Sequence, residues 1–169
     1  KLHTIGSKRR ETVIGNKLLP FVHTNYKGDG IPHEGFYTQE ELKELVTYAQ
    51  IYGIDLVPEI DIPGHGTALL VAYPEHSAYI APKEVETDWG VFHNMLSPQK
   101  ETITFLKNIF KELSEIFPST YIHIGGDEVP LDSYKKSASV RDLVKNRTLA
   151  SYRDAPAYIL EEIALYLKS

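Results

Sequence analysis

Two stretches of the chain place apolar side chains at the spacing of an amphipathic α-helix. The first begins with Thr-Gln-Glu-Glu at residues 38–41, which matches a capping box, and Gly53 is placed to end it. The second is expected to start with Ser97 as its N-cap and Pro98 at the first helical position, and to end at Pro118. The apolar faces of the two predicted helices comprise Leu42, Leu45, Val46, Ala49 and Tyr52 in the first, and Ile103, Leu106, Ile109, Phe110, Leu113, Ile116 and Phe117 in the second.

Each predicted helix is followed by a short apolar run that ends in carboxylates, at residues 54–61 and 121–128. β-Branched and aromatic residues are typical of buried strands, although Pro58 cannot donate a ladder hydrogen bond. Two helix-to-strand steps in succession favour an α/β fold with parallel strands and right-handed crossovers. Because ligands bind beyond the carboxyl ends of parallel strands, Asp127 and Glu128 fall where a reaction would take place.

The other segments carry weaker patterns. The first 36 residues are rich in turn formers such as Gly6, Asn16 and Pro32, so they are expected to form a long, mostly irregular loop. In chain order we then expect a tight turn at 63–66, a helical turn or two over 67–72, a loop over 79–94, a polar helix over 133–145, and a last helix from about Asp154 or Pro156.

Composition and charge exclude several classes of protein. The 169 residues are 42% apolar and 24% charged, as in an ordinary globular domain. Eighteen basic and 23 acidic residues give a net charge of −5, and the basic residues cluster only at 8–10, so nucleic acid is a poor partner. The absence of cysteine excludes disulfides and thiolate metal sites. No apolar stretch approaches the ~20 residues of a membrane span, and the start, which lacks Met and a signal peptide, indicates a piece of a longer chain.

The adjacent carboxylates Asp127 and Glu128 admit two interpretations. They can be a solvated acidic turn, or they can be a site, since they follow two glycines and share a strand with His123. Glycosidases ordinarily need two carboxyl groups on either side of the bond that is cleaved. Neighbouring residues, with Cα atoms about 3.8 Å apart, cannot easily reach opposite faces of one sugar ring. In a glycosidase, one of the pair would donate the proton, the other would hold the substrate, and the nucleophile would come from elsewhere.

A resemblance to one family makes this more specific. Residues 123–128, His-Ile-Gly-Gly-Asp-Glu, match the H-x-G-G-D-E signature of family-20 glycoside hydrolases, the β-N-acetylhexosaminidases. Residues 58–65, Pro-Glu-Ile-Asp-Ile-Pro-Gly-His, resemble the third-strand motif of that family, and residues 35–39 resemble the segment that leads into the preceding helix. The resemblance covers nearly the whole chain and weakens after about Leu131.

The resemblance implies a substrate-assisted, retaining hydrolysis of terminal non-reducing N-acetylhexosamines, in which the acetamido oxygen of the substrate is the nucleophile. Glu128 would be the general acid and then the base, and Asp127 would hold the acetamido N–H. His65 and Asp61 would belong to the hydrogen-bonded surround of the acid, and His123 would support the strand end. No cofactor or metal is expected, and the choice between glucosamine and galactosamine stays open.

The same resemblance implies a fold and its extent. Family members have a (β/α)₈ barrel, which takes about 250 residues, so this chain would be a partial TIM barrel with about two βα units, the third and fourth strands. Residues 1–37 would be a loop region, 38–132 two helix-strand units, and 133–169 the helices after the catalytic strand. The chain alone is then expected to be inactive and to self-associate through exposed barrel edges. A secreted, periplasmic or lysosomal location would suit the family.

Several alternatives remain at this stage. Trp89 and His93 could line a sugar subsite, because aromatic faces pack on pyranose rings, or they could simply anchor a loop. The chain could also be a non-catalytic carbohydrate-binding remnant, which would not need the intact acid pair. A metal-dependent hydrolase using Glu59, Asp61, His65 and His123 is disfavoured, because these residues lack a compact spacing such as H-E-x-x-H.

Overall fold

A computed structural model describes residues 1–15 and 26–169 of the chain, so the predicted turn former Asn16 lies outside the described residues. The helices are α1 Gln39–Ile51, α2 Thr67–Ala72, α3 Lys100–Ile116, α4 Asp132–Lys136, α5 Ala138–Lys145 and α6 Ala155–Leu167. The strands are β1 Lys8–Arg9 and β2 His33–Glu34, and the short helical turns are η1 Leu2–Gly6, η2 Pro74–His76 and η3 Tyr152–Asp154. None of the helices in the described residues is both long and apolar enough to cross a lipid bilayer.

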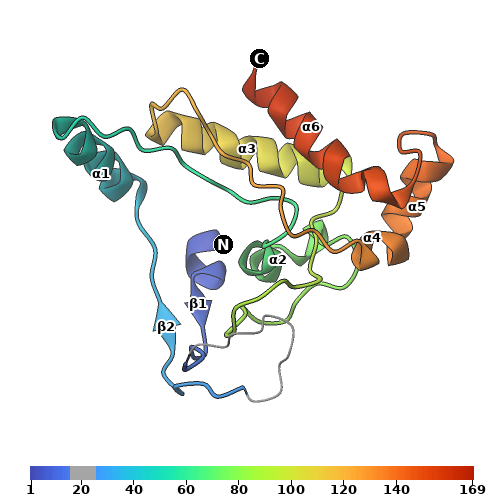
Figure 1. Ribbon diagram of the computed structural model, residues 1–169, viewed down its shortest axis with the longest axis horizontal. Coiled ribbons are helices and arrows are strands. Elements are labelled where there is room, and N and C mark those ends of the chain that lie inside the picture. Colours follow the sequence, from blue (N-terminus) through green and yellow to red (C-terminus); the bar gives the residue numbers. More distant parts are fainter. Residues whose placement is uncertain (16–25) are drawn as a thin grey trace.

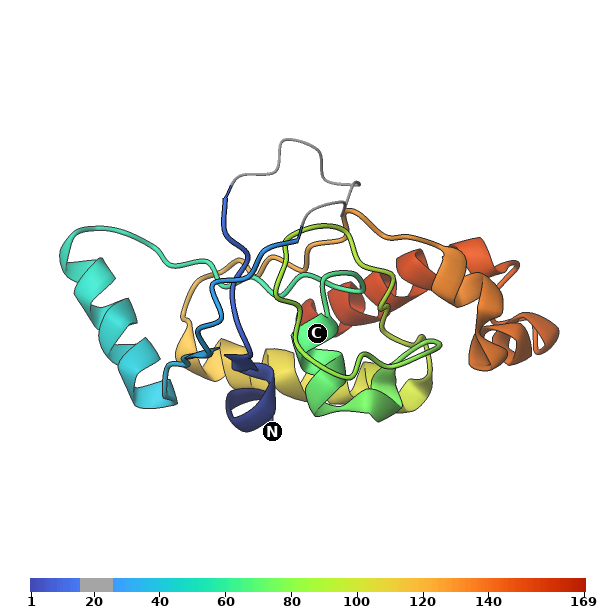
Figure 2. The same cartoon turned by 90° about the horizontal axis from the view of Figure 1, so that it is seen from below.

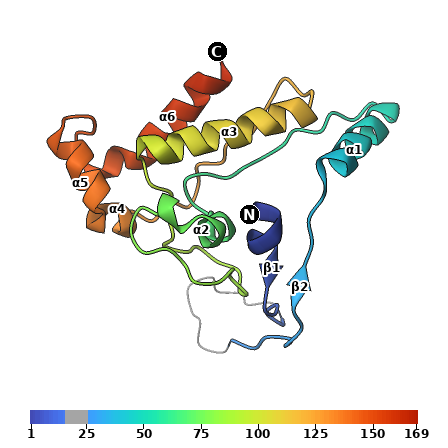
Figure 3. The same cartoon turned by 180° about the vertical axis from the view of Figure 1, so that it is seen from behind.

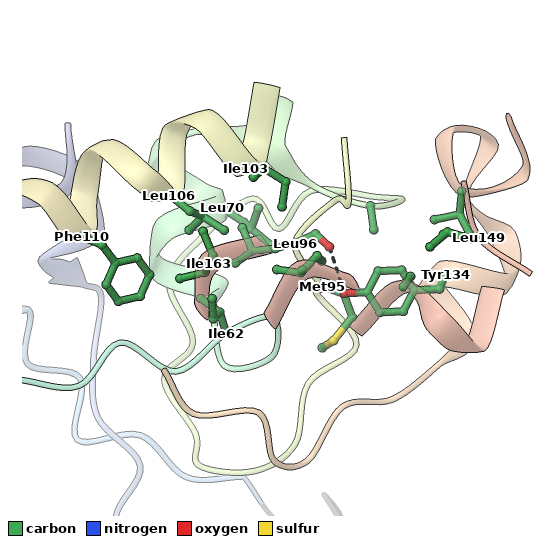
Figure 4. Close-up of a cluster of buried hydrophobic side chains, with 14 residues drawn as sticks. Ile62, Leu70, Met95, Leu96, Ile103, Leu106, Phe110, Tyr134, Leu149 and Ile163 are labelled. Atoms are coloured by element: carbon green, nitrogen blue, oxygen red, sulfur yellow. Dashed lines mark hydrogen bonds between the residues drawn. The ribbon is translucent and has the colours of Figure 1, made fainter. Parts of the chain in front are cut away.

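The core lies where α3 and α6 pack against α2 and the segment that leads into α3 (Figure 1). Leu106 and Phe110 of α3 and Ile163 of α6 are completely buried there. Of the apolar face predicted for the second helix, Ile103, Leu106 and Phe110 are buried, and the other four residues are partly buried. Figure 4 shows these side chains meeting Ile62, which immediately precedes the predicted tight turn. The core therefore fixes the backbone from which the turn at 63–66 projects.

The first predicted helix, α1, is confirmed with its capping box. The Thr38 side chain accepts a hydrogen bond from the backbone N–H of Glu41 at 3.1 Å, and the Glu41 carboxylate accepts one from the backbone N–H of Thr38 at 2.7 Å. The helix ends just before Gly53, which has a φ of +68°. Only Val46 and Ala49 of its predicted apolar face are buried, because α1 stands apart from the other helices except at one end of α3 (Figure 1).

The two predicted strands lie side by side and parallel, but they form a very short ladder (Figures 1 and 3). The His123 N–H donates to the Pro58 carbonyl at 2.9 Å, and the Ile60 N–H donates to the His123 carbonyl at 3.1 Å. The ladder cannot extend backwards because Pro58 has no N–H. It ends in the other direction at Gly125, whose backbone turns left-handed with a φ of +65°. The pairing is as predicted, and the length is shorter for these two reasons.

The starts and breaks of two later helices differ from the prediction. Ser97 does not cap α3, which begins at Lys100 with Gln99 as its N-cap. The backbone N–H of Ser97 instead donates to the His76 carbonyl at 2.8 Å, next to the isolated bridge between Ser77 and Leu96. The single helix predicted over 133–145 is two helices, α4 and α5. Ser137 separates them, because its backbone is extended and its side chain accepts from the Val140 N–H to cap α5.

The N-terminal segment is more ordered than the predicted loop. Within residues 1–15 and 26–37, η1 is followed by β1, which pairs antiparallel with β2 in the register Lys8–Glu34 and Arg9–His33. Lys8 and Glu34 also form an ion pair at 2.8 Å. Such two-residue strands leave no hydrophobic period, so the sequence pattern could not predict them. Seen from below, the parallel pair lies above α3, whereas η1 is drawn at the level of α3 (Figure 2).

Candidate active site

The structure brings together four residues that the sequence analysis singled out. Nε2 of His65 lies 3.0 Å from Oε2 of Glu128 and 4.0 Å from Oδ2 of Asp61. One carboxylate oxygen each from Asp61 and Asp127 and one ring nitrogen of His65 all lie within 4.8 Å of one another. His65 and Glu128 are 63 positions apart in sequence, and the parallel pairing of the two segments brings their turns together. We refer to Asp61, His65, Asp127 and Glu128 as the carboxylate–histidine cluster.

Two members of the cluster have unusual backbone conformations. His65 has a φ of +47° and Glu128 a φ of +48°, both in the left-handed region that non-glycine residues rarely adopt. Each such residue costs on the order of 1 kcal/mol and tends to occur where function requires it. His65 lies in the Pro-Gly-His-Gly turn, and Glu128 comes two residues after Gly126, with Asp127 between them. The direction in which each of these two side chains leaves the backbone is therefore set by a left-handed turn and not by a regular strand.

Gly125 and Gly126 let the Asp61 carboxylate approach the backbone. Oδ1 of Asp61 accepts a hydrogen bond from the Gly126 N–H at 3.0 Å. A Cβ added at Gly125 would overlap this carboxylate and lie 2.6 Å from Cα of Asp61, closer than any real contact. Both glycines also have positive φ values, +65° and +112°. The double glycine therefore allows Asp61 to tie the end of one segment to the other.

His123 lies outside the cluster and faces Glu59. Its Nδ1 is 3.1 Å from Oε1 of Glu59 and also 3.1 Å from the Gly125 nitrogen. A single ring nitrogen cannot serve both at once, because it donates to the carboxylate when protonated and accepts from the Gly125 N–H when not. Either bond fixes the ring beside the strand end. Glu59 thus pairs with His123 outside the cluster.

The other two candidates, Trp89 and His93, lie in the loop that precedes α3. Trp89 is 41% exposed, and its backbone N–H donates to its neighbour Asp88. Nδ1 of His93 lies 3.5 Å from Oδ2 of Asp132 at the start of α4, so His93 pairs outside the cluster. Asp132 was not predicted as a candidate. Its position four residues after Glu128 was the feature of the sequence that could have indicated it.

A hollow of about 510 Å³ adjoins the cluster. Asp61 and His65 form part of its wall, and the remainder is mostly apolar, with Phe36, Ile62 and Leu69 among the lining residues. Small-molecule sites commonly combine an apolar wall with a few converging polar groups. On the other side, the Glu128 side chain is 54% exposed, so water reaches the acid freely.

The sequence matches the family described as "Glycosyl hydrolase family 20, catalytic domain" over residues 1–169. A beta-hexosaminidase of Akkermansia muciniphila is 42% identical over 156 residues, which are 91% of this chain and 28% of that protein. The fold resembles a crystal structure of a beta-N-acetylhexosaminidase with a TM-score of 0.84 and 36% identity, over 98% of this chain and 33% of that one. The beta-N-acetylhexosaminidase from Bacteroides fragilis gives a TM-score of 0.73 and 36% identity, over 99% of this chain and 29% of that one.

The likeness to these enzymes indicates a TIM-barrel-type fold, although the described part of this chain is mainly helical with few strands. The chain spans a third or less of the length of each of these three relatives.

Proposed function

The chain belongs to glycosyl hydrolase family 20, and on that premise we propose that it carries the proton-transferring part of an active site for β-N-acetylhexosaminides. The reaction is the hydrolysis of terminal, non-reducing N-acetylhexosamine residues with retention of configuration. The observation that carries this proposal is the 3.0 Å contact between His65 and Glu128, inside a cluster with two further carboxylates. Segments 54–61 and 121–125 are then the third and fourth strands of the barrel.

In the first step, the carbonyl oxygen of the substrate's acetamido group attacks the anomeric carbon, and the bond from that carbon to the leaving oxygen breaks. Glu128 gives its proton to the leaving oxygen, and Asp127 accepts a hydrogen bond from the acetamido N–H. In the second step, Glu128 takes a proton from water, which attacks the anomeric carbon and releases the acetamido oxygen. His65 holds one carboxyl oxygen of Glu128, so the other oxygen is free to exchange the proton.

Asp61 acts as a positioning residue in this proposal. It binds the Gly126 N–H at 3.0 Å and lies 4.0 Å from Nε2 of His65, so it connects the glycine turn with the histidine. His123 supports the same strand end through Glu59 or Gly125. Both are expected to act through the placement of Glu128 rather than by contact with the sugar.

We also propose that the 169-residue chain alone does not hydrolyse such substrates. Glu128 is more than half exposed, whereas active sites of this kind exclude water to strengthen their electrostatic interactions. The chain should release no detectable nitrophenol from p-nitrophenyl N-acetyl-β-glucosaminide. Hydrolysis by the isolated chain that disappears in Glu128→Gln would contradict this statement.

The activity itself is best tested in a chimera, in which this chain replaces the corresponding 28% of the Akkermansia muciniphila relative. The chimera should hydrolyse the nitrophenyl substrate, and Glu128→Gln should lower kcat by about 10²–10⁴-fold. Glu115→Gln, an exposed change on α3, is the matched control and should leave kcat unchanged. Full activity in a folded Glu128→Gln chimera, checked by circular dichroism, would refute the role of Glu128. Sugar binding without any hydrolysis would favour the non-catalytic remnant instead.

We further propose that isolated chains associate with one another through α1 and the segment that follows it. Leu45, Tyr48, Ile51, Tyr52 and Ile54 are exposed there and form a largely apolar surface. Light scattering should show a mass that rises with concentration, and Ile51→Lys should reduce that rise more than the exposed change Ile80→Lys does. A chain that stays monomeric at all concentrations would contradict this.

A further inference from the structure

A positively charged surface forms around α5, at the end of the molecule opposite α1 (Figures 1 and 3). Residues 133–150 contain five basic residues and a single acidic one, Asp142, although the whole chain has a net charge of −5. The basic residues are spread along this segment, so they form no contiguous run in the sequence. Four of them, which we call the α5 basic patch, are Lys136, Arg141, Lys145 and Arg147, and all four are exposed.

The structure brings members of the α5 basic patch together. Nη1 of Arg141 donates to the Lys136 carbonyl at 3.0 Å, which places the guanidinium at the end of α4. Lys145 follows Arg141 by four residues, so both side chains start on the same face of α5, about 6 Å apart along its axis. In the part of the chain that the structure describes, the one carboxylate that pairs with the patch is Asp142, 3.6 Å from Nζ of Lys145. Most of the positive charge of the patch is therefore not paired within the chain.

Arg147 occupies a position that usually belongs to glycine. Its N–H donates to the Val144 carbonyl at 3.0 Å, and the Thr148 N–H donates to the Leu143 carbonyl at 2.9 Å, which are the two bonds of a Schellman motif. Arg147 accordingly has a left-handed φ of +61°, which glycine adopts without strain and arginine does not. The helix dipole favours a cation here, but by less than the left-handed conformation costs. The fold alone would therefore favour glycine over arginine.

The α5 basic patch suits a flexible polyanion in solution. Val140 is completely buried, and Leu143 and Val144 pack against the core, so α5 has no apolar side chain free to enter a lipid layer. All acidic residues except Asp142 lie outside residues 133–150, so a stiff nucleic-acid duplex would run along the more acidic remainder of the molecule. A flexible acidic polysaccharide can instead contact the patch alone.

We propose that the α5 basic patch binds an acidic polysaccharide through its sulfate or carboxylate groups. The patch shares no residue with the carboxylate–histidine cluster, and this binding does not depend on the proposed function. Because the contacts join exposed charges, the affinity should fall as the salt concentration rises.

The test is the binding of the 169-residue chain to fluorescein-labelled heparin, a sulfated polysaccharide, measured by fluorescence anisotropy at about 50 and 150 mM NaCl. A triple variant that combines Lys136→Gln, Arg141→Gln and Lys145→Gln should bind at least about 5-fold more weakly at the lower salt concentration.

The matched control is a triple variant with the same change of net charge elsewhere on the surface. It combines Lys43→Gln, Lys100→Gln and Lys111→Gln, all at exposed positions outside the patch. Its affinity for heparin should stay within about 2-fold of that of the unchanged chain.

The variant Arg147→Gly separates a role in binding from a role in the fold. It should weaken heparin binding by about 2–5-fold. Its midpoint of urea unfolding should nevertheless rise, because glycine suits the left-handed position. An unchanged affinity with a lower midpoint would assign Arg147 to the fold and contradict its place in the patch.

The remaining outcomes decide the site and the partner. Absence of heparin binding at about 50 mM NaCl, or equal weakening by the two triple variants, would overturn the proposal. Binding to duplex DNA or to vesicles of anionic lipid that is as tight as binding to heparin would overturn the choice of an acidic polysaccharide.

Discussion

Replacing Gly125 with alanine should destabilise the chain far more than a glycine substitution usually does. The new Cβ would overlap the Asp61 carboxylate and lie 2.6 Å from Cα of Asp61. Asp61 would have to move, and its hydrogen bond to the Gly126 N–H would be lost at a cost of about 1.5–3 kcal/mol, the range for bonds to charged groups. The left-handed conformation at Gly125 adds about 1–2 kcal/mol for any residue with a Cβ. The free energy of unfolding should therefore fall by about 2.5–5 kcal/mol.

Two other glycines separate these contributions. Gly53 has nearly the same φ, +68°, but nothing lies within 4 Å of an added Cβ, so Gly53→Ala should cost only the conformational term of about 1–2 kcal/mol. Gly35 has neither a positive φ nor a close neighbour, so Gly35→Ala should change stability by no more than about 0.5 kcal/mol.

The free energy of unfolding of all three variants is measured by urea denaturation followed by circular dichroism. Equal values of the slope m show that the variants unfold in the same transition as the unchanged chain. The expected order of loss is Gly35→Ala, then Gly53→Ala, then Gly125→Ala. If Gly125→Ala loses no more than Gly53→Ala within about 0.5 kcal/mol, Asp61 moves aside freely and the close-approach argument is refuted.

Three further predictions concern other parts of the chain. Burial lowers the pKa of His76, so the unfolded chain binds the proton more readily and the stability of the fold should decrease as the pH drops below about 6.5. Thermal melts at pH 7.5 and 5.5 should show a larger loss of stability for the unchanged chain than for His76→Gln. Equal losses in the two proteins would contradict this prediction. Tyr134→Phe removes a buried donor from the Leu96 carbonyl and should cost about 1–3 kcal/mol in urea, whereas the exposed Tyr48→Phe should cost less than about 0.5. Chelation by EDTA should leave the activity of the chimera unchanged, and a loss restored by a divalent cation would instead assign a metal to Asp61, His65 and Asp127.

Local sequence rules predicted the helices well where their own ends determine them. The capping box at Thr38 and the stop at Gly53 lie within α1 and its flanks, so no distant contact was needed to place them. The prediction of Ser97 as the cap was wrong, because its backbone N–H is bound to the carbonyl of His76, 21 residues earlier. The break at Ser137 is local, but a serine within a helical pattern does not by itself indicate whether it caps or continues the helix.

For the candidate site, the sequence predicted which residues belong together but not how they meet. The strand-end positions of Asp61, Asp127 and Glu128 follow from the helix-to-strand pattern. The left-handed conformation of Glu128 does not, because it depends on the turn that the glycines and Asp61 form jointly. Similarly, α4 is tied to the loop before α3 by the bond from the Ser133 hydroxyl to the His93 carbonyl, for which the sequence carries no periodic signal.

The matching left-handed turns at His65 and Glu128 have a practical consequence for protein engineering. A designer who grafts this histidine and glutamate onto ideal strands, and varies only side-chain rotamers, would aim both groups in the wrong directions. A transferable template must instead include the peptide conformations of the two turns, together with the glycines before Glu128. Searches of other scaffolds for similar chemistry would be most selective if they used the dihedral angles of both turns as the query.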